Sequence, residues 1–112
     1  GIGYNTMREL DYAASVFTEA IKSTAEFREY VRQKEMVKNK PGLKAALDEY
    51  RRRNFEIQNS NNESFEEIEK FEREYAAFRE DPLVDAFLAA ELAVCRMMQE
   101  VTLHITESLD FE

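Results

Sequence analysis

The sequence is poor in the residues that most often carry chemistry or cross-link a chain. Its 112 residues include one cysteine, one histidine, no tryptophan, three glycines and two prolines. A single cysteine excludes a disulfide within the chain and fits a reducing compartment. No apolar run approaches the ~20 residues of a membrane-spanning helix, and the first ten residues lack the basic and apolar segments of a signal peptide. We therefore expect a cytoplasmic protein without a membrane segment.

The residues that are abundant favour helices throughout. Apolar residues make up 44% of the chain, enough for a folded core, and Glu, Ala, Lys, Arg and Leu are strong helix formers. β-Branched runs, which are typical of strands, are absent. A chain of this length forms one domain at most. We predict a single all-α domain over residues 1–112, an antiparallel bundle of about five helices with a long C-terminal helix, and a dimer.

Helix starts are marked by capping patterns. Ser23 and Ser64 each precede a glutamate by three residues, which is the spacing of a capping box. Asp81 followed by Pro82 is typical of an N-cap and a first helical position. Apolar positions spaced by three and four residues then predict helices over residues 5–22, 24–38, 41–58, 65–79 and 81–109. Polar residues 59–62 are predicted to close a helical hairpin between the third and fourth.

The last predicted helix is the most informative segment. About 28 residues at 1.5 Å each give a rod of roughly 40 Å, and its broad apolar face is interrupted by Glu91 and Thr102. Such a rod must pack on other helices of its own chain or of a second copy, and both arrangements satisfy the same pattern. The candidate partner or dimer surface consists of Phe87, Glu91, Val94, Met97, Met98 and Val101.

Two residues of this helix have alternative interpretations. A carboxylate on an apolar face is costly unless it is paired, so we expect Glu91 to meet a Lys, Arg or Tyr from another helix. The alternative is that Glu91 sets the register or the choice of partner. Cys95 is predicted to be a small core residue.

Catalytic and metal sites are not expected. Cys95 and His104 are nine residues apart on one helix, roughly 13.5 Å along its axis, whereas a nucleophile and its base must approach to about 3 Å. Glu100 and His104 lack the Glu-x-x-His spacing of helical di-iron sites, and there is no second histidine. We expect no enzyme, no metal and no cofactor.

Charge is unevenly distributed along the chain. The net charge is −8, so general nucleic-acid binding is not expected. Residues 28–53 nevertheless hold nine Lys/Arg and four acidic residues, a net of +5, and the rest of the chain carries −13. Arg51, Arg52 and Arg53 form a candidate basic patch for an acidic partner or RNA, and the alternative function is a direct RNA-binding module that uses the basic segment 28–53. Otherwise the three arginines spread around a helix and are neutralised by the acidic residues of 65–79.

The order of these segments resembles the bacterial YlbF/YmcA family, and within it the short YheA-like members. The family's junction between its first two helices is similar to STAEFREY at residues 23–30. Its middle helix is similar to LKAALDEY at 43–50, and its last helix to DPLV at 81–84 with FLAAE at 87–91. The likeness spans about residues 7–107.

The resemblance implies a cytoplasmic all-α homodimer that acts by association. Family members are linked to competence, sporulation and biofilm control, as accessory factors of ribonuclease Y in messenger RNA processing. Ribonuclease Y machinery and sister family members are therefore the implied partners. Some members carry cysteines implicated in iron–sulfur binding, but Cys95 alone cannot supply the four thiolates of a cluster. The resulting hypothesis is a non-catalytic regulatory adaptor.

Overall fold

The computed structural model describes residues 2–60 and 64–111, and every element in that part of the chain is an α-helix. The helices are α1 (Ile2–Lys22), α2 (Ala25–Lys38), α3 (Leu43–Asn59), α4 (Phe65–Glu80) and α5 (Pro82–Ser108). The prediction of an all-α fold with five helices and a long last helix is confirmed. The predicted hairpin loop falls partly on residues 61 and 62, which lie outside the described residues.

Local sequence signals place most of the helix ends. Ser64 caps α4, and its hydroxyl accepts a hydrogen bond from the Glu67 N–H at 3.2 Å, as predicted. The start of α2 differs by one residue. Thr24, not Ser23, is the N-cap and accepts from the Phe27 N–H at 3.1 Å, while the Ser23 hydroxyl donates to the Glu19 carbonyl of α1. Ser23 therefore belongs to the end of the preceding helix.

The turn between α2 and α3 depends on one glycine. Gly42 has a φ of 79°, in the left-handed region that glycine adopts without steric cost. This turn delays the start of α3 to Leu43, two residues after the predicted start.

Asp81 fixes the sharp junction between α4 and α5. One of its carboxylate oxygens accepts from the Leu83 N–H at 2.9 Å, and the other lies 3.4 Å from the Lys40 ammonium. The hydrogen bond from the Leu83 N–H, and next the contact with Lys40, lower the pKa of Asp81 below its ordinary value of 3.8. The ionised form of Asp81 is therefore favoured by the fold.

Replacing Asp81 tests this junction. Asp81→Ala is expected to lower the melting temperature by about 4 °C because it removes the cap. Asp81→Asn keeps a capping oxygen but not the charge, so it should cost less.

The charge of Asp81 makes its contribution to stability depend on pH. Because the pKa of Asp81 is lowered in the folded state, its charge stabilises the fold above the unfolded pKa, and this stabilisation is lost as the pH falls through the folded pKa. The difference in melting temperature between wild type and Asp81→Asn, measured by circular dichroism, should therefore shrink below about pH 4; a constant difference would contradict this.

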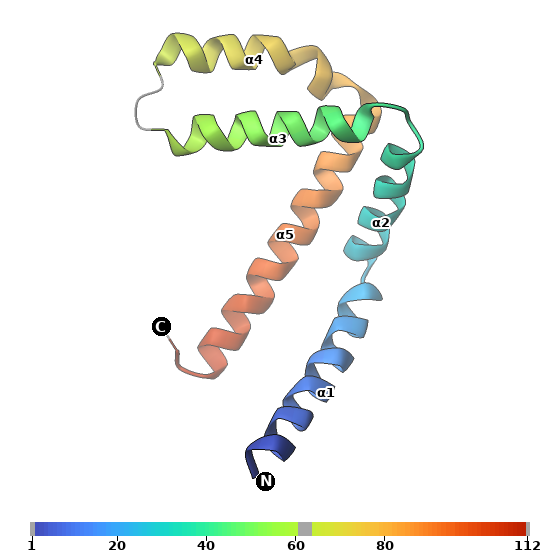
Figure 1. Ribbon diagram of the computed structural model, residues 1–112, viewed down its shortest axis with the longest axis vertical. Coiled ribbons are helices and arrows are strands. Elements are labelled where there is room, and N and C mark those ends of the chain that lie inside the picture. The colour runs from blue at the N-terminus through green and yellow to red at the C-terminus, as the bar shows by residue number, and fades with distance from the viewer. Residues whose placement is uncertain (1, 61–63, 112) are drawn as a thin grey trace.

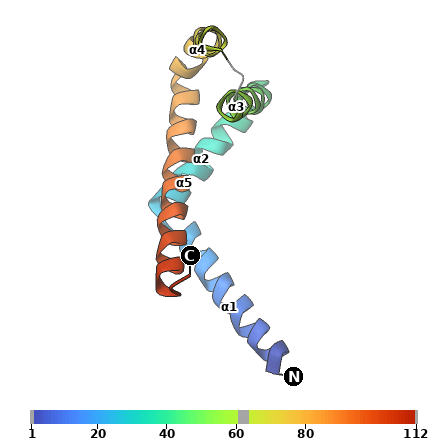
Figure 2. The same cartoon turned by 90° about the vertical axis from the view of Figure 1, so that its left-hand side faces the viewer.

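The helices form an open arrangement. Figure 1 shows α1 and α2 following one another as a bent rod, with α2 along α5. The α3–α4 pair lies across α5 at its N-terminal end. Figure 2 shows α1 running away from α5. The radius of gyration is 18.9 Å, against about 13 Å for a compact domain of this length. Much of the helical surface is therefore not covered by the chain itself.

The core lies where α2, α3 and α5 meet. It is formed by the buried side chains of Val37, Leu43, Leu47, Val84 and Phe87. A second cluster joins α3 to α4. Tyr50 stacks on Phe71 with ring centroids 5.8 Å apart and meets the edge of Tyr75 at 5.1 Å. These aromatic contacts hold the antiparallel hairpin that the sequence predicts.

Candidate functional site

The apolar face of α1 is exposed over most of its length. Leu10 is 62% exposed and Phe17 41% exposed. Together with Met7 and Ala14 they lie on one face of the helix, because they are spaced by three, four and seven residues. No described helix buries these residues. The helix with this pronounced apolar stripe is therefore the one that the chain covers least.

The apolar face of α5 is covered at one end and open at the other. Phe87 and Ala90 are buried near its start, where α2 and α4 pack on it. Met98 and Ile105, farther along, are 37% and 43% exposed. The reason is visible in Figure 2, where α1 departs from α5 instead of continuing alongside it. This open end carries a depression of about 390 Å³, lined by Met98, Gln99, Thr102, Leu103 and Thr106.

We refer to these two parts together as the open apolar surface: Leu10 and Phe17 on α1, and Met98 and Ile105 on α5. The accessible area of the whole chain is 8865 Å². A compact monomer of 13.1 kDa exposes about 6,400 Å². The chain thus leaves about 2,500 Å² more surface accessible than a compact monomer would.

The residues predicted as the partner surface on α5 are divided by the fold. Met98 is exposed, and Val94, Met97 and Val101 are half-buried. Phe87 is 3% exposed and packs in the core, with its ring centre 5.9 Å from that of Tyr30. The prediction that Phe87 lies on an accessible partner surface is therefore wrong. Periodicity marks the apolar face of a helix but not the point at which the neighbouring helices stop covering it.

Glu91 is paired across helices, as predicted. Its carboxylate accepts a short hydrogen bond from the Arg51 guanidinium of α3. The guanidinium also lies 5.2 Å from the centre of the Phe87 ring. Glu91 thereby ties α5 to α3 at the edge of the core. This contact accounts for a carboxylate on an otherwise apolar face.

Neutralising Glu91 measures how much the pair of Glu91 and Arg51 contributes to the free energy of unfolding. The Glu91 and Arg51 side chains are 31% and 39% exposed, so solvent screening keeps the pair modest. Glu91→Gln is expected to lower the free energy of unfolding by about 0.5–1 kcal/mol. Urea denaturation measures this change, with Glu100→Gln, an exposed position on the same helix, as the control. Equal effects of the two substitutions would contradict a specific role for Glu91.

Cys95 is exposed rather than buried, which corrects the prediction of a core position. The neighbouring helices leave this part of α5 open. His104 is also exposed, farther along the same helix. The fold therefore gives neither residue the enclosed environment in which a reactive pair usually works.

The three consecutive arginines do not form a joint patch. Arg51 turns to α5, and Arg52 pairs with Glu49 and Glu56 of its own helix. Arg53 donates to Glu74 of α4 at 3.0 Å, and this hydrogen bond raises the pKa of Arg53. The expectation that the arginines spread around the helix agrees with these contacts, although only Arg53 is neutralised by α4.

Ion pairs also occupy most of the basic segment 28–53. Six of its nine basic residues contact carboxylates: Arg32, Lys40, Lys44, Arg51, Arg52 and Arg53. Direct RNA binding through this segment would have to replace these carboxylates with phosphates. The structure thus supports the RNA-binding alternative less than the net charge of residues 28–53 alone suggests.

Together, the fold and this surface define an all-α protein built for helix packing. Comparison with protein families gives a match over residues 11–110 to the family described as control of competence regulator ComK, YlbF/YmcA. Because the match covers most of the chain, the protein belongs to the YlbF/YmcA family, as the resemblance predicts. The family description gives the protein a regulatory context. Comparisons with curated proteins and with solved structures find no match.

None of the helices that the structure describes is both long enough and apolar enough to cross a bilayer.

Proposed function

We propose that this chain is a non-catalytic, cytoplasmic regulatory adaptor that acts by helix-mediated association with itself and with other proteins. The regulatory description of the family supports the first part of this proposal. The observation that carries the second part is the open apolar surface, with Leu10 and Phe17 of α1 exposed. An apolar stripe along a helix is stable when another helix covers it.

A second copy of the chain is the proposed occupant of this surface. Stable homodimer interfaces bury about 2,000–5,000 Å² in total, or about 1,000–2,500 Å² on each chain. The excess accessible area of about 2,500 Å² is at the upper end of that range. Two-fold symmetry places the same surface on both copies, so the surface must be complementary to itself.

Charge is compatible with self-association. Two copies with a net charge of −8 repel each other at a distance. The face of α1 that carries Leu10 and Phe17 also holds Ala13, Ala14 and Ala20, and none of these is charged. The contact can therefore form without burying like charges, and the alanines allow helices to approach closely.

The proposed protein partners are ribonuclease Y machinery and sister family members, because the family resemblance implies them. The test is a pull-down from native bacterial lysate with wild-type bait and with a Leu10→Glu/Phe17→Glu bait, followed by mass spectrometry. Recovery of ribonuclease Y or a sister member with wild-type bait, reduced at least about tenfold with the variant, supports the adaptor role. A wild-type bait that recovers neither would contradict it.

A further inference from the structure

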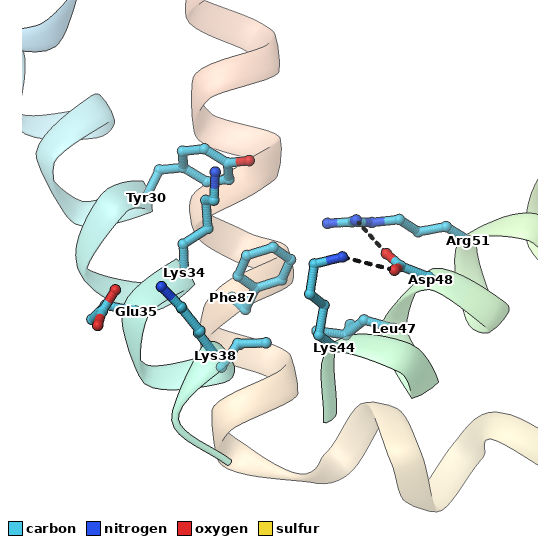
Figure 3. Close-up of a pocket in the computed structure, with 10 residues that line it drawn as sticks. Tyr30, Lys34, Glu35, Lys38, Lys44, Leu47, Asp48, Arg51 and Phe87 are labelled. Carbon is cyan, nitrogen blue, oxygen red and sulfur yellow. Dashed lines mark hydrogen bonds and ion pairs between the residues drawn. The ribbon is translucent and has the colours of Figure 1, made fainter. Parts of the chain in front are cut away.

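A cavity of about 440 Å³ lies where α2, α3 and α5 meet, which we refer to as the junction cavity. Figure 3 shows Tyr30 of α2 and Leu47 of α3 on opposite sides of it, with Phe87 of α5 between them. Leu47 and Phe87 are core residues, and the Tyr30 and Phe87 rings are 5.9 Å apart. The cavity therefore has an apolar, partly aromatic floor and the size of a small-molecule site.

Four cationic side chains surround this floor. Lys34 and Lys38 come from α2, and Lys44 and Arg51 come from α3 (Figure 3). The carboxylates that line the same cavity are those of Glu35 and Asp48. The lining thus has two more positive than negative groups, and one more when Glu91, the partner of Arg51 on α5, is counted, in a chain whose net charge is −8. Such a local reversal of charge favours an anionic ligand.

Several of these cations can accept an additional anionic partner. Lys34 and Lys38 form no ion pair within the part of the chain that the structure describes, and the Lys34 ammonium lies 5.5 Å from the centre of the Tyr30 ring. Arg51 Nε is shielded from solvent and has no hydrogen-bond partner in the described part of the chain. Because Nε is shielded from solvent, a ligand would meet the two lysines and the terminal nitrogens of the guanidinium rather than Nε.

Asp48 shows where an anionic group is held. Its carboxylate oxygens lie 3.1 Å from the Lys44 ammonium and 3.5 Å from the Arg51 guanidinium, as drawn in Figure 3. The chain's own carboxylate thus occupies a position between two cations at the cavity edge. An incoming anion would share or replace Asp48 as their partner, while its body lies against the aromatic floor.

We infer that the junction cavity binds a small organic anion whose body is either a flat aromatic ring or an aliphatic chain. The anionic head lies among the lysines and Arg51, and the body packs on Tyr30 and Phe87. The floor of the cavity is formed by core side chains, and its volume suits a small molecule rather than a helix or a nucleic-acid duplex. This site is separate from the open apolar surface, so either proposal can fail without the other.

Phenyl phosphate is the probe for this site, because it combines a phosphate head with one aromatic ring. Its titration into ¹⁵N-labelled full-length protein, followed by amide chemical shifts, is expected to give saturable shifts around Lys34, Lys44 and Phe87. Inorganic phosphate carries only the anionic head, and benzyl alcohol carries only the aromatic ring. Each should bind at least about fivefold more weakly than phenyl phosphate. Shifts that do not saturate, or that are equal for all three compounds, would overturn the proposal.

Two variants and a matched control make the test specific. Lys34→Gln/Lys38→Gln is expected to weaken phenyl phosphate binding about fivefold, because it removes two ion-pairing groups. Lys22→Gln/Lys70→Gln, which neutralises two exposed lysines outside the cavity, should leave the affinity unchanged. Equal weakening by both pairs would show nonspecific attraction and overturn the proposal.

Replacing Asp48 provides a test with the opposite sign. Asp48→Asn removes the internal carboxylate that competes for Lys44 and Arg51, so phenyl phosphate should bind more tightly than to wild type. Circular dichroism confirms that the variant is folded, and a gain of affinity cannot result from unfolding. Unchanged or weaker binding by the folded variant would show that these two cations do not hold the anionic head.

Discussion

Leu47→Ala is expected to lower the free energy of unfolding by about 2–5 kcal/mol. Leu47 is 2% exposed and belongs to the core cluster at the junction of α2, α3 and α5. Truncation removes buried methyl groups and leaves a void that the surrounding helices fill only in part. Domains of this size are stable by about 5–15 kcal/mol, so one such change removes a large share of the total.

The matched control for this prediction is Leu109→Ala, the same chemical change at a position that is 70% exposed. It should cost less than about 0.5 kcal/mol. Urea denaturation followed by circular dichroism gives both values under the same conditions. Similar losses in the two variants would mean that the junction is not the stabilising core.

Leu10→Glu/Phe17→Glu is expected to convert the proposed dimer into a monomer. Each substitution places a charge on the apolar stripe of α1, and burying two unpaired carboxylates in an interface is strongly unfavourable. If the two residues act as ordinary interface anchors, the dissociation constant should rise at least about a hundredfold. Sedimentation velocity over a range of concentrations measures this change.

The chain itself provides a control for this variant. Tyr12 and Val16 are also exposed, at 73% and 54%, and lie on the opposite face of the same helix. Tyr12→Glu/Val16→Glu therefore introduces the same charges into α1 without touching the stripe, and it should leave the mass unchanged. Dissociation by this control as well would point to general charge repulsion rather than to the stripe.

The helices and most of their ends could be predicted because their determinants are local. Ser64, Asp81 and Pro82 act within one turn of the helix that they start, so the sequence near each end is sufficient. The error at Ser23 has the same local character, because two adjacent hydroxyl residues compete for one capping position. The pairing of Glu91 was also predictable, since an unpaired carboxylate on an apolar face is costly.

The extent to which each helix is covered could not be predicted, because it depends on the angles between helices. Phe87 and Met98 belong to the same periodic face of α5, yet the first is buried and the second is exposed. Gln33 is the opposite case, a polar residue that is only 4% exposed on α2. Its side chain donates to Glu29 at 2.8 Å, and this contact, after the larger effect of the hydrogen bond from Arg32, lowers the pKa of Glu29.

The junction cavity was also beyond the reach of sequence reasoning. The basic character of residues 28–53 is evident from their composition, but Arg51, Arg52 and Arg53 point in different directions because consecutive helical residues are about 100° apart. The fold instead groups Arg51 with Lys44 on α3 and with Lys34 and Lys38 on α2. Only the packing of α2, α3 and α5 at their junction places these side chains around one cavity.

Sedimentation equilibrium of the unmodified protein tests the central claim of self-association most directly. The open apolar surface predicts a mass of twice the 13.1 kDa of the chain at micromolar concentrations, with dissociation only on strong dilution. A mass of 13.1 kDa at every concentration would contradict the proposal that a second copy covers α1 and the open end of α5.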